Sequence, residues 1–138
     1  GRLEPQDLHH PDFPFKWSPP PIIRSIPLNS GHSMPALGLG TYQAPPDALG
    51  NVVSFALKAG YRHFDCAAIY HNEDGVGKAL AASTVPRDTL FVTSKLWNSE
   101  HAPEDVVPAV QQTLSDLQLT YLDLYLVHWP QAYAKVRG

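Results

Sequence analysis

The chain has 138 residues, 43% of them hydrophobic and 17% charged, which is enough for one domain with a core and too little for two. The formal net charge of −3 provides no basic patch and argues against a nucleic-acid partner. The single cysteine excludes an internal disulfide, and no apolar run approaches the roughly 18 residues that span a bilayer. Because the N-terminus also lacks the layout of a signal peptide, we expect a cytoplasmic protein with no membrane partner.

Residues 1–25 are rich in proline and show neither helical nor strand periodicity, so we predict a disordered or extended N-terminal arm. Residues 26–138 are predicted to form the folded part. This part opens with two short apolar stretches on either side of Asn29-Ser30-Gly31, a turn-forming sequence, which predicts a small β-hairpin.

After the hairpin, strand-like and helix-like segments alternate along the chain. Asp47 is expected to cap the first helix and Gly60 to end it. Pro108 is expected to distort the third helix or to delay its start, because proline lacks a backbone N–H. The predicted strands are 36–41, 62–67, 89–96 and 121–129, and the predicted helices are 47–60, 72–83 and 102–117.

The predicted strands start near residues 37, 63, 90 and 122, at intervals of 26, 27 and 32 residues. This is the period of repeated βα units with parallel strands and right-handed crossovers. The apolar runs 90–92 and 124–127 predict strands that are covered on both faces. A doubly wound dinucleotide fold would place a third glycine where the chain has Gln43, after Gly38 and Gly40. We therefore predict a (βα)₈ barrel.

Four chemically active side chains follow the predicted strands, at the end where barrel enzymes carry their working groups. They are Asp65, Tyr70, Lys95 and His128. Each alone also fits a structural role, such as a helix cap or a solvated strand end, but their convergence from three successive strands favours chemistry. An ammonium beside a phenol eases loss of the phenol proton, a carboxylate fixes the ammonium, and an imidazole can orient a substrate oxygen. The set contains no nucleophile, so a hydride from a nicotinamide is the natural complement.

At this point the sequence resembles a known family. Four stretches, in the right order and spacing, look like the N-terminal half of the aldo-keto reductases, and the resemblance runs from about residue 26 to residue 130. The stretches are GLGTY (38–42), GYRHFDCAAIYHNEDGVGKAL (60–80), FVTSKLW (91–97) and LQLTYLDLYLVHWP (117–130).

The resemblance implies a (βα)₈ TIM barrel that binds NADPH across its mouth and reduces aldehydes or ketones to alcohols. Tyr70 would be the proton donor, Lys95 would assist it, Asp65 would hold Lys95, and His128 would orient the carbonyl. The resemblance also implies cofactor contacts at Gly40, Thr41 and Asp65, and an apolar substrate wall of Tyr42, Ile69, Trp97 and Trp129.

Only the first four strands and three helices of such a barrel are predicted here, and the family's remaining cofactor-binding segments lie in the later part of the fold. Two alternatives to an active reductase therefore stay open. The chain could be a truncated, non-catalytic subunit or scaffold, with another protein chain completing or covering the half barrel. A less favoured alternative is a metal-dependent barrel hydrolase that uses His63, Asp65 and His128 as ligands, although the resemblance implies no metal.

Overall fold

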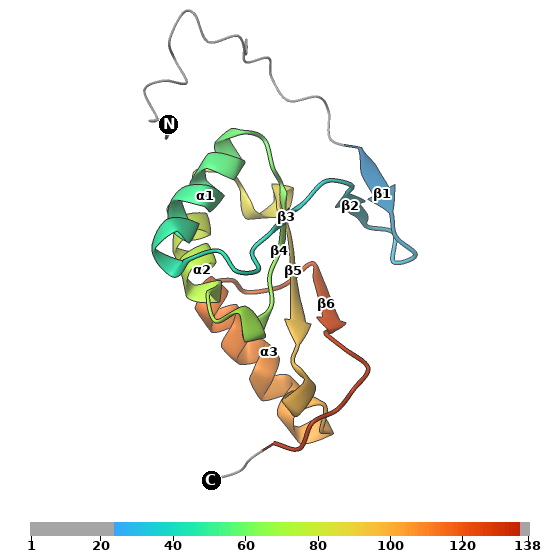
Figure 1. The fold of residues 1–138 in the computed structure, drawn as a ribbon. Helices are drawn as coiled ribbons and strands as arrows, with labels where there is room; N and C mark the ends of the chain where they lie inside the picture. The colour runs from blue at the N-terminus through green and yellow to red at the C-terminus, as the bar shows by residue number, and fades with distance from the viewer. Residues whose placement is uncertain (1–23, 136–138) are drawn as a thin grey trace, which may run out of the picture.

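The computed structural model describes residues 24–135 (Figure 1). The fold begins with an antiparallel hairpin of β1 (Ser25–Pro27) and β2 (Ser33–Pro35). Gly31 allows the turn between them, because its φ of 86° is strained for residues with a side chain. The predicted hairpin is confirmed. The predicted arm lies outside the described residues except for its last two, and Ser25 already belongs to β1.

Four parallel strands form the main sheet, in the order β3-β4-β5-β6. In this arrangement each strand pairs with the next one along the chain, which confirms the βα repeat and the first part of a barrel. The strands are β3 (Leu39–Gly40), β4 (His63–Asp65), β5 (Phe91–Leu96) and β6 (Leu124–Val127). They are shorter than predicted, and β3 keeps only two residues.

Three helices cover one face of this sheet (Figure 1). They are α1 (Pro46–Lys58), α2 (Glu73–Ala81) and α3 (Pro103–Leu117), and short 3₁₀ turns lie at Ala68–Tyr70, Arg87–Thr89 and Asn98–Glu100. The core lies between the helices and the sheet, and its completely buried side chains include Leu49, Val53, Phe64, Val76, Val92 and Leu117. The helix layer therefore has the apolar interior that its sequence period predicts. No helix within residues 24–135 has the length and apolar composition needed to cross a membrane.

Two details of the helices differ from prediction. Asp47 lies inside α1, which begins at Pro46 with Pro45 in the capping position, because proline is well suited to a first helical turn. The expectation for Gly60 is confirmed, since it follows the helix with a φ of 96°. The delayed start expected from Pro108 is wrong. Helix α3 runs without a break from Pro103, and Pro108 is exposed within it. The proline removes one backbone N–H donor, but the helix continues past it.

The last strand also differs from prediction. Strand β5 is buried along almost all of its length, as expected for a strand covered on both faces. Strand β6 is not: Leu126 is 41% exposed and Val127 59% exposed. Within residues 24–135 no strand pairs with the outer edge of β6. The apolar run 124–127 predicts a strand that is covered on both faces, but part of this strand is exposed.

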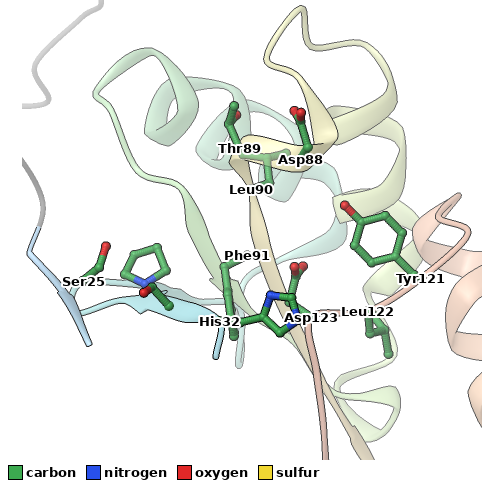
Figure 2. Close-up of a pocket in the computed structure, with 11 residues that line it drawn as sticks. Ser25, His32, Asp88, Thr89, Leu90, Phe91, Tyr121, Leu122 and Asp123 are labelled. Atoms are coloured by element: carbon green, nitrogen blue, oxygen red, sulfur yellow. The ribbon is translucent and has the colours of Figure 1, made fainter. Parts of the chain in front are cut away.

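The hairpin lies near the N-terminal end of the sheet and forms one wall of a pocket of about 410 Å³ (Figure 2). Ser25 and His32 line it from the hairpin, Phe91 from the first position of β5, and Asp123 from the residue before β6. Asp123 accepts hydrogen bonds from the Val92 N–H at 2.8 Å and from Arg87 at 2.7 Å. At this end of the sheet the Asp123 carboxylate therefore has a structural role, since it binds Arg87 and the backbone of β5.

Candidate active site

The four predicted catalytic side chains all lie at the opposite, C-terminal edge of the sheet. Asp65 is the last residue of β4, and Tyr70 ends the 3₁₀ turn that follows. Lys95 is the penultimate residue of β5, and His128 comes directly after β6. Because the strands are parallel, their carboxyl ends share one edge, so the fold brings these residues together.

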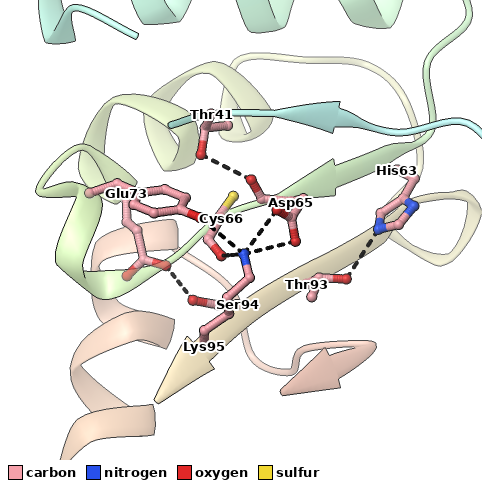
Figure 3. A network of polar contacts seen from close by, with 9 residues as sticks. Thr41, His63, Asp65, Cys66, Glu73, Thr93, Ser94 and Lys95 are labelled. Carbon is pink, nitrogen blue, oxygen red and sulfur yellow. Dashed lines mark hydrogen bonds and ion pairs between the residues drawn. The ribbon is translucent and has the colours of Figure 1, made fainter. Parts of the chain in front are cut away.

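Lys95 is the centre of the site (Figure 3). Its ammonium nitrogen, Nζ, lies 2.9 Å from both carboxylate oxygens of Asp65 and 2.9 Å from the backbone oxygen of Cys66. The same nitrogen lies 3.3 Å from the phenol oxygen of Tyr70. The Lys95 side chain is only 13% exposed, whereas that of Asp65 is 40% exposed. A charged donor is therefore fixed against the phenol while the carboxylate keeps an open side.

His128 completes the group through ring contacts. Its imidazole packs edge-on against the Tyr70 ring, with centroids 5.8 Å apart, and against Trp97 at 5.2 Å. Burial, and next the nearby Lys95 ammonium, lower the pKa of His128 below its usual value, against an opposing effect of Asp65. The lowered pKa favours the neutral ring, in which one of the two nitrogens carries a hydrogen that can be donated.

Of the predicted cofactor contacts, Gly40 and Asp65 border open space. Gly40 is exposed, and a side-chain carbon added to it would meet no atom within 4 Å. Thr41 is different, because it is fully buried. Both its backbone N–H and its hydroxyl donate to the backbone oxygen of Asp65, each at 3.1 Å. The contacts of Thr41 are therefore with the strand that carries Asp65, and its part in cofactor binding stays a prediction.

Aromatic side chains surround the four polar groups. The Tyr42 ring lies 5.0 Å from that of Tyr70, and Trp97 lies 5.4 Å from Trp129. Ile69 lies with Trp97 along a pocket of about 430 Å³ beside α3, which lines it from Pro108 to Asp116. Tyr133 was not predicted, yet its ring packs against Trp97 at 6.1 Å and its N–H donates to Asn98. The only available signal was a further aromatic residue shortly after Trp129.

Two buried polar residues at the start of α2 were also missed by sequence reasoning. Asn72 donates a 2.9 Å hydrogen bond to the backbone oxygen of Thr41, and Glu73 accepts one of 2.6 Å from the Ser94 hydroxyl. In the sequence both look like the polar start of a helix. Their partners, 31 and 21 residues away along the chain, become neighbours only in the folded structure.

The metal-hydrolase alternative requires His63, Asp65 and His128 to converge, and they do not. The two ring nitrogens of His63 face the backbone oxygen of Pro35 at 3.2 Å and the hydroxyl of Thr93 at 3.1 Å. Asp65 is held by Lys95. Among residues 24–135 no three acidic, histidine or cysteine side chains form a group that could hold a metal ion.

Cys66 offers no nucleophile at this site. Its side chain is fully buried, and burial raises the pKa of the thiol to about 12, with further upward contributions from nearby carboxylates. The reactive thiolate is therefore not formed at neutral pH. What the site can do is hold an oxygen next to a phenol, an ammonium and a neutral imidazole.

Comparison with known proteins gives one consistent result. The model of the Aldo/keto reductase family matches residues 36–137. Aldo-keto reductase family 1 member A1 of Rattus norvegicus is 53% identical over 116 residues, and that of Homo sapiens 55% over 113 residues. These matches cover 80% and 78% of the chain but only 36% and 35% of the relatives. The chain thus spans about a third of the length of these relatives.

Solved structures give the same picture. An aldo/keto reductase from Brucella melitensis superposes with a TM-score of 0.77 at 47% identity, covering 79% of this chain and 42% of that one. The aldo-keto reductase of Bombyx mori, solved in complex with NADP, superposes with a TM-score of 0.75 at 44% identity. That superposition covers 80% of this chain and 39% of the Bombyx mori chain.

Proposed function

Because the chain belongs to the aldo-keto reductase family, we propose that it takes part in NADPH-dependent reduction of aldehydes or ketones to alcohols, with Tyr70 as the proton donor. One observation carries the proposal: the Lys95 ammonium is held by both oxygens of Asp65 and touches the Tyr70 phenol oxygen. An ion pair that served only to stabilise the fold would not require a partly exposed phenol and a histidine beside it.

The residues present fit the nicotinamide end of a cofactor. Gly40 and the exposed side of the Asp65 carboxylate flank open space next to Tyr70. When bound there, NADPH supplies a hydride to the carbonyl carbon. The proposed contacts of this chain are with Gly40, Thr41 and Asp65.

The side chains of this protein supply the proton that completes the reduction. As negative charge develops on the carbonyl oxygen, Tyr70 donates its phenol proton to it, and the phenolate left behind lies against the Lys95 ammonium. Asp65 keeps that ammonium in place. The neutral His128 donates a hydrogen bond to the same oxygen and orients it. The substrate carbon skeleton would rest on Tyr42, Ile69, Trp97 and Trp129, which favours small aldehydes with an apolar or aromatic group.

A second candidate is a non-catalytic subunit that keeps these side chains without using them. It is favoured by the outer edge of β6, which no strand within residues 24–135 covers. In that role the partner would be another protein chain that covers the half barrel. For either role we propose a reducing, cytoplasmic setting, since the only cysteine is buried and unpaired.

The test is oxidation of NADPH, followed by absorbance, in the presence of a nitrobenzaldehyde. Tyr70→Phe should abolish turnover while leaving NADPH affinity, measured by fluorescence, nearly unchanged, because it removes only the proton donor. Tyr121→Phe is the matched control, since Tyr121 lies at the opposite end of the sheet against Arg87. A Tyr70→Phe variant with near wild-type turnover would refute the mechanism. NADPH binding without any turnover in the wild type would favour the non-catalytic subunit.

A further inference from the structure

The first turn of α2 carries two polar side chains that are almost completely buried. Asn72 is 2% exposed and Glu73 is 4% exposed. Asn72 occupies the capping position of α2, yet its side chain makes no capping hydrogen bond with the helix. The hydrogen-bond partners of both side chains lie outside α2, so these contacts are not those of a helix cap.

Asn72 reaches the loop that follows β3, the strand paired with β4, and β4 carries Asp65. Its side-chain amide donates to the backbone oxygens of Thr41 at 2.9 Å and of Ala44 at 3.4 Å. Thr41 in turn donates its N–H and its hydroxyl to the backbone oxygen of Asp65. A continuous chain of hydrogen bonds thus connects Asn72, through Thr41, to the residue that holds Lys95.

Glu73 reaches the strand that carries Lys95. It accepts the 2.6 Å hydrogen bond of Ser94, which is completely buried and directly precedes Lys95 on β5 (Figure 3). Burial raises the pKa of Glu73, and the hydroxyls of Ser94 and of Thr113 on α3 act in the opposite direction. A buried carboxyl group is costly to keep, so a contact with the strand of the central lysine indicates a role beyond packing.

We propose that Asn72 and Glu73 are positioning residues, which hold Asp65 and Lys95 in register with Tyr70 through Thr41 and Ser94. Tyr70 lies only two residues before Asn72. The start of α2 is therefore connected to three of the four candidate catalytic side chains: Asp65, Tyr70 and Lys95. The inference deepens the proposed function, on which it rests, because it assigns to the start of α2 the alignment of the Lys95 ammonium with the phenol.

The first experiment needs neither substrate nor cofactor. Spectra of ¹³C-labelled lysine and tyrosine report on Lys95 and Tyr70 in the chain itself. Glu73→Ala removes the acceptor for Ser94 and should move both signals, whereas Glu73→Gln keeps an oxygen there and should restore them. Asp74→Ala is the matched control, because the neighbouring Asp74 is exposed and pairs with Lys78 on the surface; its spectra should stay wild-type.

The second experiment is kinetic. Glu73→Ala should lower kcat about 10- to 100-fold with unchanged NADPH affinity, and Glu73→Gln should recover most of the loss. Unmoved Lys95 and Tyr70 signals in Glu73→Ala, or a glutamine variant that behaves like the alanine variant, would overturn the proposal. If Glu73→Ala does not fold, Ser94→Ala, which removes one hydroxyl, gives the same test. If the wild type shows no turnover, the proposed function fails, while the spectra still decide on the positioning role.

Discussion

Gly77 offers the most quantitative test of how the helix layer supports the site. This residue of α2 is buried where α2 meets α3, and a side-chain carbon added to it would lie 2.6 Å from the carbonyl carbon and 2.8 Å from the Cα of Leu117. Ordinary carbon contacts are about 3.5 to 4.0 Å. Because the neighbour is backbone, a rotamer change cannot relieve the clash, so Gly77→Ala must move the two helices apart.

The expected magnitude follows from two opposing terms. Overpacking of this kind costs about 1 to 3 kcal/mol, and a clash against backbone belongs at the upper end. Alanine gains about 1 kcal/mol over glycine in a helix interior. We therefore expect a net loss of about 2 kcal/mol in the free energy of unfolding. Gly50→Ala in α1 is the matched control, because nothing lies within 4 Å of its added carbon, and it should gain about 1 kcal/mol.

The assay is urea unfolding of the chain and both variants, followed by circular dichroism. The midpoints of the two variants should move in opposite directions. The m-values should stay similar if unfolding exposes the same surface area in each protein. Because α2 also begins with Asn72 and Glu73, Gly77→Ala should disturb the Tyr70 signal as well. Equal stabilities of Gly77→Ala and Gly50→Ala would refute the close approach of α2 and α3.

Two further predictions concern charge and exposure. Burial raises the pKa of Glu73 above 4.5, so its protonated form favours the fold and that contribution is lost as the pH rises through the folded pKa. The stability of Glu73→Gln relative to wild type should therefore increase above about pH 4.5 and then level off, and parallel unfolding curves across this range would contradict it. The open side of β6 should make the isolated chain associate with itself or with another protein, which light scattering after size exclusion can measure.

The order of elements and the convergence of the four candidate side chains could be predicted because their signals are local. The apolar runs and their spacing identify the strands, and Asp65, Lys95 and His128 each stand at a strand end. Parallel pairing then brings them together without any knowledge of side-chain contacts. A local signal also argues against a dinucleotide fold, because Gln43 stands where its third glycine would be.

What could not be predicted depends on contacts between distant segments or on fine steric choices. Asn72 and Glu73 look like ordinary polar residues of a helix start, and only the approach of α2 to the sheet gives them partners. Whether Pro46 or Asp47 begins α1 is decided by a local preference too small to read from a pattern. The apolar run of β6 predicts a buried strand, but burial needs a neighbour on its outer edge.

That open edge has an energetic consequence. Leu126, Val127 and Trp129 are 41%, 59% and 47% exposed, and full burial of a large apolar side chain is worth about 1.5 to 3 kcal/mol. With roughly half of each exposed, a partner could gain about 2 to 4 kcal/mol from these three, a substantial part of the 5–15 kcal/mol that usually stabilises a domain. The unpaired backbone groups of β6 add a template for another strand. Val127→Lys should therefore reduce association without loss of helical signal, and a wild-type chain that stays monomeric at high concentration would show that the exposed face needs no partner.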